Sequence, residues 1–242
     1  MIPLMVIAGS DSSGGAGLTR DVATAGELGF QVKPVLTSVT AQTDQSFLKN
    51  HQIPSDIVQA QITAAMTDTA LGAIKIGMLG TTEIAKTVME CLDASDIPVI
   101  LDPVLKSSSG GSLFSGGDIC DLFPITMLVT PNLDEAAQLT NRPKAVNEAD
   151  IKLQAALLMQ RGASAVLIKG GHANGVDCID HFFNAKGHTL LTAPRLEQQK
   201  RGTGCTLSTA IACYIAAGYS LENACQMAKQ YVGEWLRGHL EK

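Results

Sequence analysis

The sequence predicts an α/β protein in which helices cover both faces of a mostly parallel central sheet, that is, a three-layer α/β/α sandwich. Short strand-like runs alternate with helical patterns along the chain, which is the order that right-handed βαβ units produce. Several of these runs are continuously apolar, as expected of strands covered on both faces, at residues 99–101, 127–129 and 166–168.

The individual elements follow this alternation from the first residues onward. Residues 4–8 are apolar without interruption and predict a first strand, which runs into a Gly/Ser loop. Residues 17–28 predict a helix, because apolar residues recur on one side at Leu18, Val22, Ala25 and Leu28. Further strands are predicted at 31–39, 73–76, 98–101, 127–129 and 165–168, and further helices at 57–66, 81–92, 206–217 and 221–236.

A hairpin completes the predicted sheet. Residues 177–184 and 188–191 are strand-like and flank an Asn-Ala-Lys-Gly turn at 184–187. Neither a linker nor an internal repeat separates the elements, so we expect residues 1–242 to form a single domain.

Composition excludes several classes of protein. The 242 residues are 45% hydrophobic and carry a formal net charge of -5 without a basic stripe, which argues against a nucleic-acid partner. The six cysteines form no Cys-x-x-Cys pair and predict reduced thiols in the cytoplasm. The N-terminal residues lack the basic region of a signal peptide, and no apolar run is long enough to predict a membrane span.

Polar residues follow five of the predicted strands directly. Ligands of open parallel sheets bind outside the carboxyl ends of the strands, so these clusters predict one extended ligand site at that edge. This is the strongest argument from the residues alone for an enzyme or a ligand-binding protein. The clusters begin at Gly9, Gly77, Asp102, Thr130 and Lys169.

The turn Gly202-Thr203-Gly204-Cys205 precedes an apolar helical pattern. Glycines before a helix let backbone N–H groups converge on an anion, and the helix dipole strengthens the attraction. The turn alone fits an ordinary helix cap better than a phosphate site. Cys205 is expected at the helix start, where the thiol pKa should be lowered and the thiolate could accept a proton.

Two acids and one lysine have the chemistry of a nucleotide site. Asp102 ends a strand, Glu135 begins a helix, and Mg²⁺ commonly takes one or two carboxylates together with phosphates. Lys169 follows an apolar strand and could neutralise phosphate charge. Two of the three also have a plain alternative, since Glu135 fits a capping box and Lys169 fits a strand-end turn. The loop at 9–17 matches neither a Rossmann nor a Walker motif.

Taken in order, the motifs resemble those of a known family. The segments involved are 7–12, 14–17, 40–42, 75–79, 101–104, 130–133, 135–136, 169–172 and 202–208. The ordered set is similar to that of hydroxymethylpyrimidine/phosphomethylpyrimidine kinases of thiamine biosynthesis, which are members of the ribokinase-like superfamily.

The resemblance implies ATP-dependent phosphorylation of a pyrimidine alcohol and of its monophosphate, with Mg²⁺, by a cytoplasmic homodimer. It implies a base role for Cys205 and an anion hole at Gly202 and Gly204. The remaining roles it implies are pyrimidine binding by Gly9, Asp21, Gln42, Met78 and Val104, ATP binding by Lys169, Thr203 and Asn132, and magnesium binding by Asp102 and Glu135.

The sequence departs from the family pattern where the substrate is expected to be covered. Arg201 stands where the family usually has histidine, and we expect its charge to favour a phosphorylated substrate. Thr43-Asp44-Gln45 and the Ser/Gly segment at 107–110 also differ. Two alternatives stay open: a pyridoxal kinase of the same superfamily, and a non-catalytic ligand-binding relative.

Overall fold

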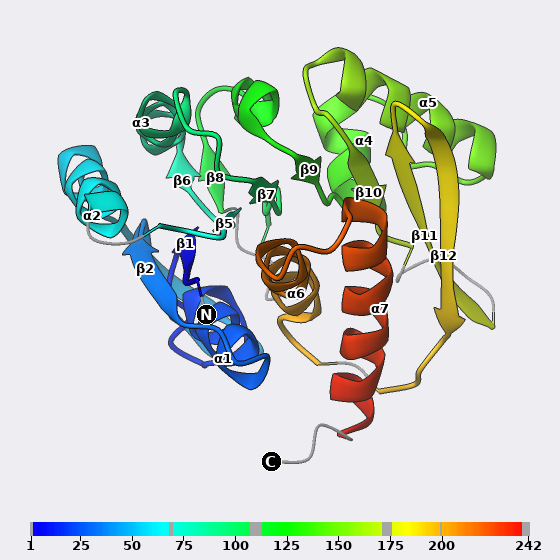
Figure 1. The fold of residues 1–242 in the computed structure, drawn as a ribbon, viewed down its shortest axis with the longest axis horizontal. Coiled ribbons are helices and arrows are strands. Elements are labelled where there is room, and N and C mark those ends of the chain that lie inside the picture. The colour runs from blue at the N-terminus through cyan, green and yellow to red at the C-terminus, as the bar shows by residue number, and fades with distance from the viewer. Residues whose placement is uncertain (1, 68–69, 107–112, 171–175, 199, 239–242) are drawn as a thin grey trace.

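The computed structural model describes residues 2–67, 70–106, 113–170, 176–198 and 200–238. Its centre is an eight-stranded sheet in the order β12-β11-β10-β9-β7-β5-β1-β2 (Figure 1). The strands from β10 to β2 pair in parallel, and β11 pairs antiparallel with both β10 and β12. The predicted α/β class with a mostly parallel sheet is confirmed.

The eight strands of the sheet range from two to eight residues in length. They comprise β1 (Leu4–Ala8), β2 (Val32–Leu36), β5 (Ala73–Ile76), β7 (Val99–Leu101), β9 (Leu128–Val129), β10 (Val166–Ile168), β11 (Asp177–Asn184) and β12 (Gly187–Pro194). Every residue of β1, β5, β7 and β10 is buried. Burial on both faces explains why these strands read as continuous apolar runs.

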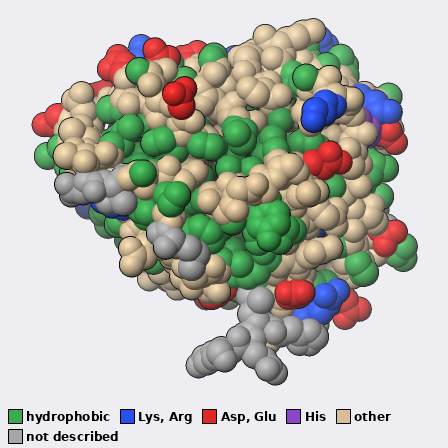
Figure 2. All heavy atoms as spheres, viewed as in Figure 1, with side chains coloured by type: hydrophobic (Ala, Val, Ile, Leu, Met, Phe, Trp, Pro, Cys, Tyr) green, Lys and Arg blue, Asp and Glu red, His purple; other side chains and the backbone are tan. Residues whose placement is uncertain are grey.

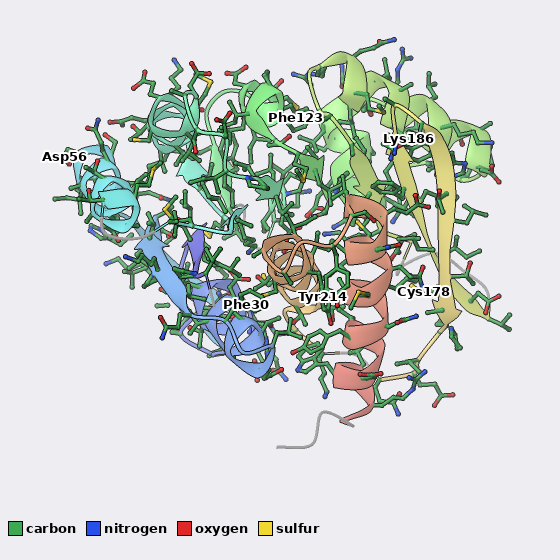
Figure 3. All side chains as sticks on the ribbon, in the orientation of Figure 1. Phe30, Asp56, Phe123, Cys178, Lys186 and Tyr214 are labelled. Atoms are coloured by element: carbon green, nitrogen blue, oxygen red, sulfur yellow. The ribbon has the colours of Figure 1, made fainter. Side chains whose placement is uncertain are left out.

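Helices form the two outer layers. One hydrophobic cluster packs the sheet against α2 (Ser55–Thr67), α3 (Thr82–Leu92), the 3-10 helix η1 (Ile119–Ile125), α4 (Leu133–Thr140) and α5 (Glu148–Gln160). The other cluster packs it against α1 (Gly17–Glu27), α6 (Thr203–Ala216) and α7 (Leu221–Arg237). Figure 3 labels Phe123 in the first layer and Phe30 and Tyr214 in the second.

The predicted strand at 31–39 is wrong in its extent. The chain leaves the main sheet after β2 and continues as β3 (Ser38–Gln42), which pairs with β4 (Phe47–Gln52) in a separate hairpin. A further pair, β6 (Gly80–Thr81) with β8 (Phe114–Ser115), was not predicted either. Pattern alone did not reveal these elements, because β4 is largely polar and exposed and β6 and β8 have two residues each.

Basic side chains are scattered on one face of the molecule. On the face shown in Figure 2, the described Lys and Arg side chains are dispersed at the margins and form no stripe. Within the described ranges, no helix combines the length and apolarity needed to cross a bilayer.

Candidate active site

A cavity of about 1150 Å³ opens at the carboxyl ends of the parallel strands. The chain passes from β1 outward to β2 and later returns to β5 on the other side of β1, and such a switch of direction leaves a crevice for ligands. Eleven of the thirteen predicted site residues line this cavity: Gly9, Gln42, Met78, Asp102, Val104, Asn132, Glu135, Lys169, Gly202, Gly204 and Cys205. The clusters that begin at Gly9, Asp102 and Lys169 therefore meet at one cavity, whereas Gly77 and Thr130 themselves are not among its lining residues.

The turn at Gly202 has a conformation that favours glycine. Gly202 is the N-cap of α6 with a φ of 79°, and a Cβ added there would lie 2.2 Å from the carbonyl oxygen of Gly15. The close approach joins the first turn of α6 to the Gly/Ser loop after β1. The N–H groups that begin α6 therefore lie beside the cavity, where they can attract an anion.

Substitutions of Gly202 and Gly204 should affect different properties, the first the stability of the fold and the second the rate of the reaction. Gly202→Ala should destabilise the protein by about 1–3 kcal/mol, because both φ and the Gly15 contact oppose a side chain. Gly204→Ala should melt close to wild type, since its Cβ would lie 3.4 Å from the Lys169 amine, yet lower kcat by intruding on the cavity. Thermal melting and assays of enzymatic activity test this. Equal melting temperatures for the two variants would contradict it.

Lys169 is held between two carboxylates. Its amine lies 2.8 Å from Asp102 Oδ1 and 3.9 Å from Glu135 Oε2. Burial lowers the pKa of Lys169, but the charges of Asp102 and Glu135 outweigh burial and raise it, so the amine stays protonated. Asp102 also accepts weak hydrogen bonds from Thr130 at 3.3 Å and Ser208 at 3.4 Å. The group presents one fixed cation to the cavity.

Asn132 and Glu135 together cap α4. Asn132 Oδ1 accepts from the N–H groups of Asp134 and Glu135, and Glu135 Oε2 accepts from the N–H of Asn132 at 2.8 Å. The capping-box alternative for Glu135 is thus present, and it coexists with a place on the cavity wall. Burial raises the pKa of Glu135 to about 7, against the opposing effect of Lys169.

The thiol pKa of Cys205 differs from the value that its place at the start of a helix predicts. Burial raises the pKa of its thiol to about 12, although Lys75 acts in the opposite direction. Asp21 and Asp102 add to the rise, while the N–H of Gly17 donates to the sulfur and opposes it. The prediction of a lowered pKa is therefore wrong for the free protein, because desolvation outweighs the helix terminus.

Asp21 lies beneath the cavity and does not line it. Its fully buried carboxylate pairs with Lys75 at 2.7 Å and accepts from Thr209 Oγ1 at 2.8 Å. Lys75 does line the cavity, and sequence reasoning missed it. Burial lowers the pKa of Lys75, but the charge of Asp21 outweighs this and raises it, so Lys75 is a buried cation. A lysine inside an apolar strand was the signal that could have found it.

Thr203 also lies away from the cavity lining. Its hydroxyl donates to the carbonyl oxygen of Lys200 at 2.7 Å and closes the turn before α6. The structure therefore does not bring this hydroxyl to the place expected of it. The motif residues 171–172 and the Ser/Gly segment 107–110 lie outside the described residues.

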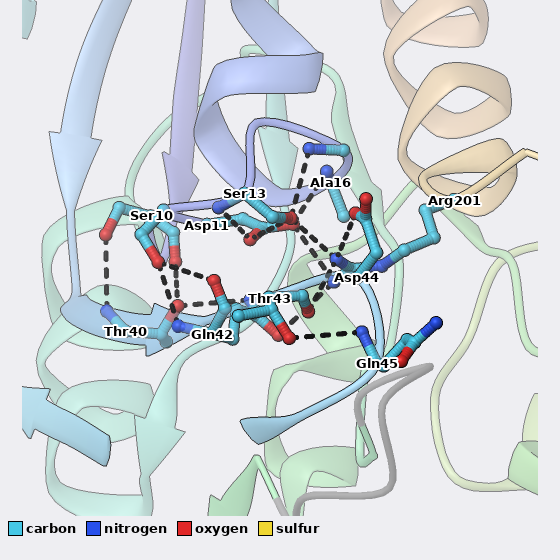
Figure 4. A network of polar contacts seen from close by, with 12 residues as sticks. Ser10, Asp11, Ser13, Ala16, Thr40, Gln42, Thr43, Asp44, Gln45 and Arg201 are labelled. Carbon is cyan, nitrogen blue, oxygen red and sulfur yellow. Dashed lines mark hydrogen bonds and ion pairs between the residues drawn. The ribbon is translucent and has the colours of Figure 1, made fainter. Parts of the chain in front are cut away.

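Arg201 joins three segments at the cavity (Figure 4). It donates to Asp11 and Ser13 in the loop after β1, and to Gln42, the Thr43 carbonyl and Asp44 around the end of β3. Two carboxylates thus match its charge. Asp11, which the sequence analysis did not single out, also accepts from the N–H groups of Ser13 and Ala16 and so shapes the loop.

The chain is similar to known proteins over almost its whole length. The family model described as phosphomethylpyrimidine kinase matches residues 11–242. A hydroxymethylpyrimidine/phosphomethylpyrimidine kinase of Streptomyces coelicolor is 39% identical over 234 residues, which are 95% of this chain and 86% of that relative.

Solved structures of related kinases superpose on the chain over almost its whole length. Phosphomethylpyrimidine kinase of Clostridium difficile superposes with a TM-score of 0.84 at 33% identity, covering 98% of this chain and 100% of that one. Pyridoxal kinase of Staphylococcus aureus in complex with pyridoxal superposes with a TM-score of 0.87 at 31% identity, covering 98% and 88%. On the match of almost its whole length, the chain belongs to the phosphomethylpyrimidine kinase family.

Proposed function

We propose that the chain transfers the γ-phosphoryl group of ATP to 4-amino-5-hydroxymethyl-2-methylpyrimidine, to its monophosphate, or to both, in thiamine biosynthesis. The observation that carries this is the convergence of Lys169, Asp102 and the first turn of α6 on one cavity. The alcohol oxygen bonds to the γ-phosphorus, the bond to ADP breaks, and the hydroxyl loses its proton. A fixed cation and backbone N–H groups stabilise the charge that gathers on the phosphoryl oxygens.

The substrate side of the cavity fits a flat ring with polar edges. Met78 supplies an apolar contact, and a Cβ at Gly9 would lie 2.9 Å from its sulfur, so glycine leaves room there. Val104 lines the same cavity, and Gln42 supplies an amide that can match an aminopyrimidine. Asp21 acts on this side through Lys75, which it holds in place.

The ATP side fits Mg²⁺ as well. Asp102 and Glu135 offer hard oxygen donors on either side of Lys169, and Lys169 and Asn132 line the cavity next to them. Within the described ranges no cluster of three acid, His or Cys ligands could hold a metal alone. Two carboxylates completed by phosphate oxygens and water suit Mg²⁺, which would neutralise phosphate charge when bound. Thr203 contributes by closing the turn that shapes the anion hole.

Cys205 is the proposed acceptor of the alcohol proton. At neutral pH its thiol is protonated in the free protein, because its pKa of about 12 lies far above 7. If Cys205 is the base, its thiolate fraction has to rise when the substrate binds. Otherwise the rate of phosphoryl transfer depends on how ATP and the alcohol are positioned, without a base.

This proton state makes a testable prediction for the free protein. Alkylation of Cys205 by iodoacetamide should be slow at pH 8 and should still increase above pH 10, because only the thiolate reacts. Peptide mass spectrometry at a series of pH values measures it, with Cys205→Ser as the control for peptide assignment. A reaction that reaches its plateau below pH 8 would contradict the raised pKa.

The deciding experiment is an ATP/Mg²⁺ assay with hydroxymethylpyrimidine, its monophosphate and pyridoxal side by side. Pyridoxal is included because the similarity to the Staphylococcus aureus pyridoxal kinase favours it as second candidate. We expect the highest kcat/KM with the pyrimidine alcohol or its phosphate. A preference for pyridoxal would transfer the assignment to a pyridoxal kinase. Tight binding of an alcohol without turnover would identify a non-catalytic relative.

We also propose a cytoplasmic homodimer whose subunits are single kinase domains spanning residues 1–242. The exposed apolar side chains of Val39 and Leu48 on the β3–β4 hairpin support association of two copies. Light scattering coupled to size exclusion, with Leu48→Lys as the variant, measures this.

A further inference from the structure

The backbone of Gln42 is fixed from both sides by one serine. Ser12 Oγ accepts from the N–H of Gln42 at 2.8 Å and donates to its carbonyl oxygen at 2.9 Å. The Gln42 side chain lines the cavity from this fixed point. The position of its Cα therefore does not depend on Arg201, and only the direction of its amide is left to be decided.

Two partners favour the same direction. Thr40 Oγ1 donates its hydrogen to the carbonyl of Ser10 at 2.7 Å and accepts from Gln42 Nε2 at 3.1 Å, but this hydroxyl can turn and donate to a reversed amide. Arg201 has only donors, so the atom that it contacts at 3.2 Å must be Oε1. Reversing the amide would set donor against donor at the Arg201 end.

Arg201 is itself held firmly enough to enforce this direction. Its side chain is 16% exposed and pairs with Asp11 at 3.1 Å and Asp44 at 3.1 Å. It also donates to Ser13 Oγ at 2.6 Å and to the Thr43 carbonyl at 3.1 Å (Figure 4). Because two carboxylates already match the guanidinium charge, its contacts favour an internal role over capture of a substrate phosphate.

We infer that Arg201 is a specificity-determining positioning residue, which restricts the Gln42 amide to one hydrogen-bonding polarity. The inference rests on the proposed function, in which Gln42 contacts the pyrimidine. Exchanging the 4-amino group for a 4-oxo group converts a donor into an acceptor and changes the neighbouring ring nitrogen from acceptor to donor. A locked amide accepts only one of these patterns, whereas an amide that can turn over accepts both.

The test is the ratio of kcat/KM for the 4-amino alcohol and its 4-oxo counterpart. Arg201→Ala should lower this ratio about tenfold. Without Arg201 the Gln42 amide can turn over and match the 4-oxo alcohol, which removes the one mismatched hydrogen bond that this alcohol makes with the wild-type protein. Arg201→Lys should give an intermediate ratio, since one amine cannot reproduce the fork of donors. Lys152→Ala is the control: it removes an exposed cation that pairs with Glu148 on α5, away from the cavity, and should leave the ratio unchanged.

A double-variant cycle shows whether Arg201 acts through Gln42. Gln42→Ala should remove the discrimination, and adding Arg201→Ala should then change the ratio no further. A ratio that stays at the wild-type value in Arg201→Ala, or independent effects in the double variant, would overturn the inference. Melting temperatures of all variants separate these results from a general loss of fold.

A readout without turnover separates this inference from the proposed function. The side-chain amide of Gln42 should give one ordered pair of ¹⁵N–¹H signals in the wild-type free protein and averaged signals in Arg201→Ala. An equally ordered amide in both proteins overturns the inference, whatever the assays show. Failure of the wild type to phosphorylate any of the alcohols overturns the proposed function instead and leaves the positioning of Gln42 to be judged by these signals.

Discussion

Lys75→Met should be the most destabilising single substitution of those considered. It leaves the Asp21 carboxylate fully buried without its cation, and breaking such a pair costs about 3–5 kcal/mol. For a chain of this length, the loss corresponds to a fall in melting temperature of about 10 °C. Differential scanning calorimetry and urea denaturation measure it.

The double variant Asp21→Asn/Lys75→Met is the control for this effect. Asparagine still accepts the hydrogen bond from Thr209 but carries no charge, so at least half of the lost stability should return. Thr209→Val should cost less than Lys75→Met, because it removes one hydrogen bond and no charge partner. A double variant as unstable as Lys75→Met would show that the buried charge is not the cause.

Lys169→Met should have the largest effect on the reaction. It removes the cation that Asp102 and Glu135 hold toward the cavity, and loss of one fixed charge-stabilising group lowers kcat by about 10²–10³-fold. Steady-state kinetics with ATP varied at saturating alcohol should show the loss mainly in kcat.

Two further lysine variants make this result specific. Lys152→Met changes an exposed lysine that pairs with Glu148 on α5, and it should leave kcat at the wild-type value. Lys169→Arg keeps the charge but replaces a compact amine with a wider fork, so it should recover only part of the rate. Wild-type kcat in Lys169→Met would remove this lysine from the mechanism.

The sheet could be predicted because its strands lie where the periodicity is strongest. The strands at 4–8 and 73–76 were predicted to the residue, since continuous apolar runs leave little freedom in their bounds. The β3–β4 hairpin was missed because β4 alternates weakly and faces solvent on much of its surface. Helix α5 had no prediction, and its apolar residues are not concentrated on one face.

The sequence could predict those site residues that directly follow a strand of the parallel sheet. Asp102 and Lys169 follow buried strands directly, so their meeting at one edge follows from the parallel order. The placement of Asp21 and the pKa of Cys205 depend on burial, which a sequence motif does not record. Arg201 was visible as a departure from the family, but the five groups that accept its hydrogen bonds here come from two distant segments, among contacts that the sequence does not reveal.

These distant contacts also bear on how the chain folds. Arg201 meets Asp11 across 190 positions of sequence, and Thr209 meets Asp21 across 188. Contacts of such separation form late, because the entropy of closing a long loop is lost before they can compensate for it. The individual βα units can therefore form and pack before the distant residues of the active site come into contact. During refolding, kinase activity should be among the last properties to return, which makes it a strict reporter of the completed native state.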